Sequence, residues 1–253
     1  MTKGTFRSLD VFNYRVWAIG SLVSNVGTWM QRTAQDWLVL TELTHRSATA
    51  VGVVMGLQFG PQLLLLPWSG YAADRFDRRK LLIATQAASG LMALVLGLLV
   101  VTGLVQLWHV YVFAFLSGCV NAVDSPARQT FVSDLVGDDD LSNAVALNSL
   151  SINAAQMIGP AAAGGLIAAV GSGWAFLFNA VSFGAALASL GFLRVAELHP
   201  SARAGCARGS LAEGLRYVRS RPDLKTILWM ILPIGMFGLN FPIFISTMSV
   251  KVF

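Results

Sequence analysis

Long apolar runs separated by short polar connections are the feature that most constrains how this chain folds. Seven such runs can be placed, and each has the length of about 20 mainly apolar residues that a helix needs to cross a bilayer. The runs are too long for barrel strands and lack their sustained alternation. We therefore expect an all-α membrane protein. The predicted spans cover residues 14–40, 49–70, 81–104, 108–131, 141–170, 174–193 and 224–248.

The composition agrees with a chain that lies in a bilayer. Apolar residues make up 55% of the sequence and charged residues only 12%, whereas soluble domains carry about 25% charged residues. The two cysteines, Cys119 and Cys206, lie in unlike surroundings and predict free thiols. The sequence has no P-loop, no HExxH and no G-x-S-x-G motif, and no cluster of metal-ligand residues. We therefore expect neither an enzyme nor a bound metal or cofactor.

Lys and Arg fall mainly in every second connection, and this asymmetry predicts the orientation of the chain. The opposite connections have Arg46 in the first loop and no Lys or Arg in the next two. Because basic residues gather on the cytoplasmic side, we expect a multi-pass protein of the cell membrane with a cytoplasmic N-terminus. The basic side carries Lys3, Arg7, Arg15, Arg75, Arg78, Arg79, Lys80, Arg194, Arg203, Arg208, Arg216, Arg219, Arg221 and Lys225.

The same distribution bears on partners. The net charge of +5 follows from membrane topology, so we expect no nucleic-acid partner. The expected partners are the lipid bilayer and a small molecule, and the expected state is a monomer.

The connection after the sixth run is the longest and most polar, and it predicts a division of the chain. Its sequence GSLAEGLRYVRSRP fits a capping box from Ser210 to Glu213. We expect a short amphipathic helix on the inner membrane surface; an ordinary solvated linker helix is the alternative. The predicted parts are a six-helix bundle (1–195), a cytoplasmic loop (196–223) and a seventh helix (224–253) that begins a second bundle. A seventh span after a six-helix bundle gives an odd number of spans, which predicts that the sequence is truncated.

The stretch WMQRTAQDWLVL, residues 29–40, places two charges inside the first apolar run. Spacings of four and three residues put its polar members on one helical stripe. A charge at this depth costs at least about 2.5 kcal/mol if it faces lipid, so the stripe is expected to face protein or a water-filled cavity. The stripe comprises Ser21, Asn25, Thr28, Arg32 and Gln35, with Asp36 beside it.

The fourth and fifth runs carry similar stripes. Three polar stripes predict a shared aqueous pathway. The alternative is that the pairs Arg32–Asp36 and Asp124–Arg128, each one turn apart, only fix packing. The candidate cavity and coupling residues are Asn25, Arg32, Gln35, Asp36, Asn121, Asp124, Arg128, Asn153 and Gln156. In the second run, Gly52, Gly56 and Gly60 form a double GxxxG pattern, which predicts a close helix contact.

Residues 70–80, GYAADRFDRRK, are similar to the signature between the second and third helices of the major facilitator superfamily. Gly70, Asp74, Arg75, Arg78 and Arg79 match it, and Asp77 replaces its second glycine. Residues 124–136 and 147–166 resemble a drug and siderophore exporter branch of that superfamily. The second of these stretches also resembles the antiporter motif of the fifth helix. Gly159, Pro160 and Gly164 are in place, whereas Ala163 stands where a glycine is usual and Gln156 where many relatives have a basic residue.

The resemblance implies a twelve-helix transporter, of which this sequence holds a bundle of 3+3 inverted repeats and the seventh helix. It implies that the first and fourth helices line the cavity. Asp74 would pair with Arg78 or Arg79 in a cytoplasmic latch, beside Gly70, which would allow a close helix approach; plain topogenic charge is the alternative for this motif. Gly159 and Pro160 would bend or thin the fifth helix.

The implied function is proton-coupled efflux of amphipathic drugs or siderophores by alternating access, driven by the proton gradient without a cofactor. Asp36 and Asp124 are the candidates for coupling. A seven-helix receptor, a non-transporting scaffold, or an importer of the same superfamily are the alternatives.

Overall fold

The computed structural model describes residues 4–199, together with 220, 221, 223, 226 and 230. Inside its helices, the side chains of residues 66–75 and 138 are not part of this description. Most of the predicted amphipathic helix and of the predicted seventh span therefore lies outside the described residues. The three-part division of the chain stays a prediction.

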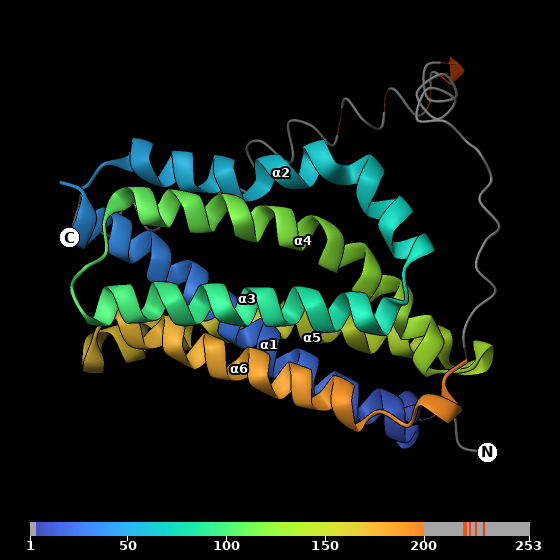
Figure 1. The fold of residues 1–253 in the computed structure, drawn as a ribbon. Helices are drawn as coiled ribbons and strands as arrows, with labels where there is room; N and C mark the ends of the chain where they lie inside the picture. Colours follow the sequence, from blue (N-terminus) through green and yellow to red (C-terminus); the bar gives the residue numbers. More distant parts are fainter. Residues whose placement is uncertain (1–3, 200–219, 222, 224–225, 227–229, 231–253) are drawn as a thin grey trace.

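Six long helices account for most of the described chain (Figure 1). A short 3₁₀ helix, η1 (Arg7–Asp10), precedes them, and η3 (Val195–Glu197) follows. The predicted positions of the first six spans are confirmed to within a few residues. The helices are α1 (Phe12–Trp37), α2 (Ala48–Arg75), α3 (Arg78–Val101), α4 (Leu107–Leu135), α5 (Asp138–Val170) and α6 (Ser172–Phe192).

Five of these helices, α2 to α6, are long and apolar enough to cross a membrane. α1 is 26 residues long, but its polar stripe lowers its hydropathy. It continues into a π-helical segment, η2 (Leu38–Leu43). The stretch WMQRTAQDWLVL therefore contains the change from α to π geometry, a change that is frequent at functional sites.

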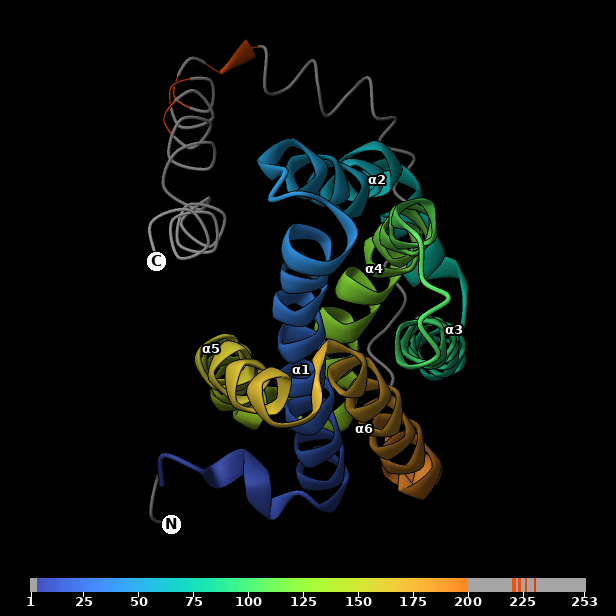
Figure 2. The same ribbon diagram turned by 90° about the vertical axis from the view of Figure 1, so that its left-hand side faces the viewer.

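Helix packing follows an internal symmetry. α1 packs against α5 and α6, α2 against α4, and α3 against both α4 and α6. Exchanging α1 with α4, α2 with α5 and α3 with α6 maps this set of contacts onto itself. This is the pattern of two inverted three-helix repeats. The end-on view shows α1 in the middle of the bundle, between α5 on one side and α4 and α6 on the other (Figure 2).

Two glycines allow the closest backbone approaches. A Cβ added to Gly118 of α4 would lie 2.5 Å from the carbonyl oxygen of Gln58 in α2. A Cβ on Gly159 of α5 would lie 2.5 Å from the Cβ of Trp29 and 3.0 Å from the backbone nitrogen of Met30, both in α1. At Gly118, α4 therefore meets the backbone of α2 directly, and at Gly159, α5 meets the backbone of α1 and the Cβ of Trp29.

The predicted contact at Gly52, Gly56 and Gly60 is wrong for the described chain. A Cβ added to any of the three would meet no described atom within 4 Å. The α2 backbone is approached at Gln58, on another face of the helix, and the glycine that permits this approach belongs to α4. The GxxxG spacing is present, but no described helix approaches these three glycines closely.

Apolar side chains form two buried clusters, one toward each end of the bundle. The cluster near the chain start includes Tyr14, Trp17, Leu82, Phe131 and Leu190. The cluster at the other end includes Leu38, Val54, Leu96, Val110 and Phe176. Along α1 and α4, Asn25, Asn121 and Asp124 of the predicted polar stripes lie between the residues of these two clusters. The bundle thus has a polar layer at mid-height.

The end of the bundle that carries η1 is held together by hydrogen bonds between distant parts of the chain. The Ser8 hydroxyl donates to Asn143 Oδ1 over 2.8 Å, and the Tyr14 hydroxyl donates to the Ala144 carbonyl over 2.8 Å. Asn13 donates to the Arg194 carbonyl and accepts from the Arg194 amide. The start of the chain is thereby fixed to α5 and to the end of α6.

Candidate functional site

A polar cavity of about 250 Å³ lies in the middle layer of the bundle. Each of the six long helices contributes to its wall. Its polar lining includes Asn25, Thr28, Gln31, Arg32, Gln58, Gln86, Ser89, Ser117, Asn121, Asp124, Arg128, Asn148 and Asn179. α1 and α4 supply most of these side chains, in agreement with the expectation that these two helices line a cavity.

Asp124 is the most heavily bonded group in the cavity wall. Its Oδ1 accepts from the Thr85 hydroxyl over 2.6 Å and from Gln86 Nε2 over 2.8 Å. Its Oδ2 accepts from Arg128 Nη2 over 3.0 Å and from Arg128 Nε over 3.2 Å. The Asp124 residue is 6% exposed. Four donors compensate the removal of this carboxylate from water, and they tie α4 to α3.

Arg128 carries the same network to α1. Its Nη1 donates to the Ser21 hydroxyl over 2.9 Å and to Asn25 Oδ1 over 3.4 Å. The predicted pair Asp124–Arg128 is therefore present, with its Oδ2–Nη2 distance at 3.0 Å. It joins three helices instead of bridging one turn alone.

Arg32 lies in the cavity wall in another environment. Its guanidinium carbon is 4.8 Å from the centre of the Trp29 ring and 5.7 Å from that of Phe59. Such contacts with aromatic faces stabilise a cation outside water. Among the described residues no ion pair joins Arg32 to Asp36. The alternative that Arg32 and Asp36 form an ion pair that only fixes helix packing therefore lacks the contact that it predicts.

Four of the predicted cavity residues are not brought into the wall. Gln35 is buried, with 3% of its surface exposed, and Asp36 is half-buried; neither lines the cavity. Asn153 and Gln156 are exposed on α5, where Asn153 Nδ2 donates to the Ser149 carbonyl within its own helix. The cavity wall instead contains side chains that the stripes did not indicate.

The missed residues include single amides and hydroxyls of α2, α3, α5 and α6, among them Asn148 of α5. Gln58, Gln86 and Ser89 belong to otherwise apolar runs, and Asn179 donates from Nδ2 to Gln31 Oε1 over 2.6 Å. A lone amide in a membrane helix needs a polar partner. This need is the sequence feature that could have indicated these residues. It does not say which helix supplies the partner.

Two buried amide atoms at this site have no partner in the described structure: Asn25 Nδ2 and Asn148 Oδ1. One is a donor and the other an acceptor, and both residues line the cavity. A buried polar group without a partner costs about 1–3 kcal/mol. The cavity therefore offers hydrogen-bonding capacity to a ligand.

The charged motif after α2 contributes a second cluster, at the end of the bundle near the chain start. Arg78 Nη1 and Asp134 Oδ1 lie 2.7 Å apart, with their side chains 15% and 11% exposed. Arg79 Nε donates to the Leu190 carbonyl over 2.9 Å. Asp77, which replaces the signature glycine, accepts from the Lys80 amide and caps α3.

Three members of that motif lie where the side chains are not described. Gly70, Asp74 and Arg75 belong to the last turns of α2. The predicted pairing of Asp74 with Arg78 or Arg79 therefore stays a prediction. Arg78 instead has Asp134 of α4 as its described partner, within the stretch 124–136.

The fifth-helix motif has mixed surroundings. Gly159 is the point of closest approach to α1, whereas a Cβ on Gly164 would meet no described atom within 4 Å. Pro160 lies inside α5, which extends to Val170. The motif thus places one glycine directly against Trp29 and Met30, next to the cavity residue Arg32.

Comparison with known proteins identifies relatives. The family described as "Transmembrane secretion effector" matches residues 4–240. The Staphyloferrin A transporter of Staphylococcus aureus is 32% identical over 159 residues, which cover 62% of this chain and 40% of the relative. Multidrug resistance protein 2 of Bacillus subtilis is 31% identical over 157 residues, covering 60% and 37%. The enterobactin exporter EntS of Shigella flexneri is 27% identical over 189 residues, covering 74% and 45%.

The matched region spans about half the length, or less, of these curated relatives. They are transport proteins and not enzymes, as expected from the absence of catalytic motifs. Together with the membrane-length helices α2 to α6, they identify a multi-pass membrane protein. The resemblance to drug and siderophore exporters is confirmed.

Proposed function

Because the chain belongs to the transmembrane secretion effector family of the major facilitator superfamily, we propose that it contributes the polar half-cavity of a secondary active exporter. The exporter moves amphipathic organic molecules out of the cell in exchange for protons. The chain lies in the cell membrane with its N-terminus in the cytoplasm. A receptor or scaffold is not favoured, because the relatives are transporters.

The observation that carries this proposal is the mid-bundle cavity with the Asp124–Arg128 pair in its wall. Ionisable side chains within a membrane helix each cost about 2.5–3.5 kcal/mol on insertion scales, and they mark transport pathways and proton relays. A bundle that served packing alone would not need a cavity lined from six helices at this depth.

The substrate class is proposed from the cavity and from the relatives. The wall combines a guanidinium on aromatic rings, at Arg32, with the unpartnered amide nitrogen of Asn25. An organic molecule with both apolar surface and hydrogen-bonding groups fits such a wall. The named relatives include transporters of siderophores and of drugs, and we propose one of these two classes here.

Of the two candidate acids, Asp36 and Asp124, we propose Asp36 as the proton carrier. Both oxygens of Asp124 are occupied by donors, so a proton there would displace an existing hydrogen bond. Asp36 makes no hydrogen bond or ion pair among the described residues, and it is half-buried one turn from Arg32. It is free to gain and lose a proton without breaking a network. Asp124 then acts as the fixed point that holds α1, α3 and α4 together.

Alternating access requires contacts that open at one end of the bundle while the other end closes. The Arg78–Asp134 pair lies toward the end that carries the chain start. At the opposite end, the Ser172 hydroxyl donates to Glu42 over 2.7 Å. Both contacts lie within the six-helix bundle, and the network at Asp124 joins three of its helices. We therefore propose that the bundle rocks as one unit and that the contacts that open and close are those it makes with the rest of the transporter.

The test is efflux from vesicles that contain the protein, with an imposed proton gradient and a panel of drugs and siderophores. We expect Asp36→Asn to abolish the dependence of efflux on the gradient. Asp10→Asn, an exposed acid outside the long helices, is the matched control and should export like the wild type. If Asp36→Asn retains full coupling, the assignment of Asp36 as the proton carrier is wrong. Net uptake driven by the gradient would identify an importer instead.

A further inference from the structure

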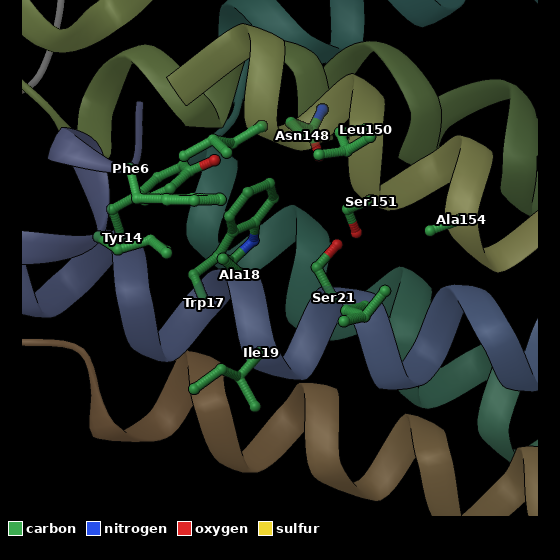
Figure 3. A pocket seen from close by; sticks show the side chains of 13 residues that line it. Phe6, Tyr14, Trp17, Ala18, Ile19, Ser21, Asn148, Leu150, Ser151 and Ala154 are labelled. Atoms are coloured by element: carbon green, nitrogen blue, oxygen red, sulfur yellow. The ribbon is translucent and has the colours of Figure 1, made fainter. Parts of the chain in front are cut away.

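A second pocket, separate in character from the polar cavity, lies between α1 and α5. It has a volume of about 300 Å³ and is bounded mainly by apolar and aromatic side chains, including Phe6, Tyr14, Trp17 and Leu147. Figure 3 shows Phe6 and Tyr14 at one end of this pocket and Ala154 at the other. The volume is at the lower end of the range of about 300–1,000 Å³ typical of small-molecule sites.

Two polar atoms among the residues that line this pocket have no partner. Asn148 is 9% exposed, and its Oδ1 makes no hydrogen bond in the described structure; the same holds for Ser151 Oγ. Figure 3 shows the hydroxyls of Ser21 and Ser151 turned toward one another across the pocket. Ser21 already accepts from Arg128. Asn148 Oδ1 therefore lacks a hydrogen-bond donor, and the Ser151 hydroxyl beside it also has no partner.

The rim of the pocket is apolar and accessible. Ile19 is 60% exposed and Leu150 is 59% exposed, one on each of the two helices. The opening of the pocket is therefore bordered by apolar side chains of both helices. Asn148 also lines the polar cavity, so the two sites share one wall residue.

We propose that this α1–α5 pocket binds a small, uncharged molecule with an apolar ring body and one hydroxyl or N–H group, which donates to Asn148 Oδ1. The ring body fills the space beside Trp17 and Tyr14, where aromatic faces offer offset or edge contacts. The single donor satisfies the amide oxygen that is otherwise left without a partner. Binding here needs no proton gradient, so it stands independently of the proposed export.

The test uses two matched fluorescent probes, dansyl amide, which carries an N–H donor, and its N,N-dimethyl derivative, which does not. The protein is held in lipid nanodiscs, and energy transfer from tryptophan to the dansyl group is titrated without a gradient, with empty nanodiscs as the background. We expect saturable transfer, with dansyl amide bound about three to ten times more tightly than the dimethyl derivative, the factor that one net hydrogen bond gives.

Two pairs of variants locate the site. Asn148→Leu should abolish the preference for dansyl amide, whereas Asn121→Leu, which alters the polar cavity alone, should retain it. Ala154→Phe should fill the pocket and remove saturable transfer, whereas Val181→Phe, at a 72% exposed position of α6, should leave it unchanged.

The proposal is overturned if the wild type gives no saturable transfer, or if Asn148→Leu keeps the preference. It is also overturned if Ala154→Phe binds like Val181→Phe. Should Ala154→Phe fail to fold, as judged by size-exclusion chromatography, the comparison of Asn148→Leu with Asn121→Leu decides alone.

Discussion

Asp124 and Arg128 illustrate how single residues hold this bundle. The carboxylate receives four hydrogen bonds from Thr85, Gln86 and Arg128, and Arg128 reaches Ser21 on α1. Removal of one member leaves an uncompensated charge in a low-dielectric layer. The same two charges that are costly alone are thus compatible with a membrane helix when they are fully bonded.

We predict that Asp124→Ala lowers the free energy of unfolding by about 3–5 kcal/mol, the usual cost of leaving one partner of a buried ion pair alone. Thermal unfolding of the purified protein in detergent measures this as a lower Tm. Glu197→Ala removes one partner of an exposed pair, with side chains 59% and 53% exposed, and should change stability by less than about 1 kcal/mol. Equal shifts for the two variants would contradict the assigned role of the network.

Sequence patterns placed some residues of the site correctly and others not, for a geometric reason. On α1, Asn25 and Arg32 line the cavity, but Gln35 and Asp36 lie beyond it, because the helical stripe is longer than the cavity. On α5, the face formed by Ala155, Gly159 and Ala163 is buried. Asn153 and Gln156 point elsewhere. Periodicity identifies a polar face, and packing decides what that face meets.

At the scale of elements, helix length and hydropathy were enough to predict the six described helices, because a span must satisfy all its backbone hydrogen bonds internally. Their contacts were harder to predict. A run of small residues indicates only that a close approach is possible, as Gly52, Gly56 and Gly60 show. The role of Gly171 is clearer. It alone joins α5 to α6, and it does so with a φ of 96°, which other residues rarely adopt.

We predict that Gly118→Ala loosens the contact of α2 with α4 and destabilises the protein by about 1–3 kcal/mol, the usual cost of overpacking. The added Cβ would lie 2.5 Å from a backbone oxygen, which cannot move aside as a flexible side chain does. Gly52→Ala in α2 is the matched control, and it should be neutral because nothing described lies within 4 Å. The two Tm values check this, and a larger loss for Gly52→Ala would refute the described packing.

At the scale of the whole molecule, the inverted repeats place the two charged stripes in equivalent positions. α1 and α4 correspond under the exchange that preserves the helix contacts, and both contribute polar side chains to the mid-bundle cavity. The cavity is thus a consequence of the symmetry. Each repeat supplies one polar helix, and the apolar clusters above and below separate this layer from both ends.

The two ends of the described bundle differ in charge, and this difference makes the orientation testable. One end carries Arg7, Arg15, Arg78, Arg79, Lys80 and Arg194, whereas the described connections at the opposite end (residues 44–47, 102–106 and 171) carry Arg46 as their one Lys or Arg. Basic residues resist translocation across the membrane. We therefore predict that the end with the chain start faces the cytoplasm.

Single-cysteine variants of a protein with Cys119 and Cys206 replaced by Ser measure this orientation. Thr5 and Leu104 are both exposed, one at each end. A membrane-impermeant maleimide added to intact cells should label Leu104→Cys and leave Thr5→Cys unlabelled, and both should react once the cells are broken. Labelling of Thr5→Cys in intact cells would reverse the orientation. It would also move the Arg78–Asp134 pair to the outer face, where it could not act as the proposed cytoplasmic contact.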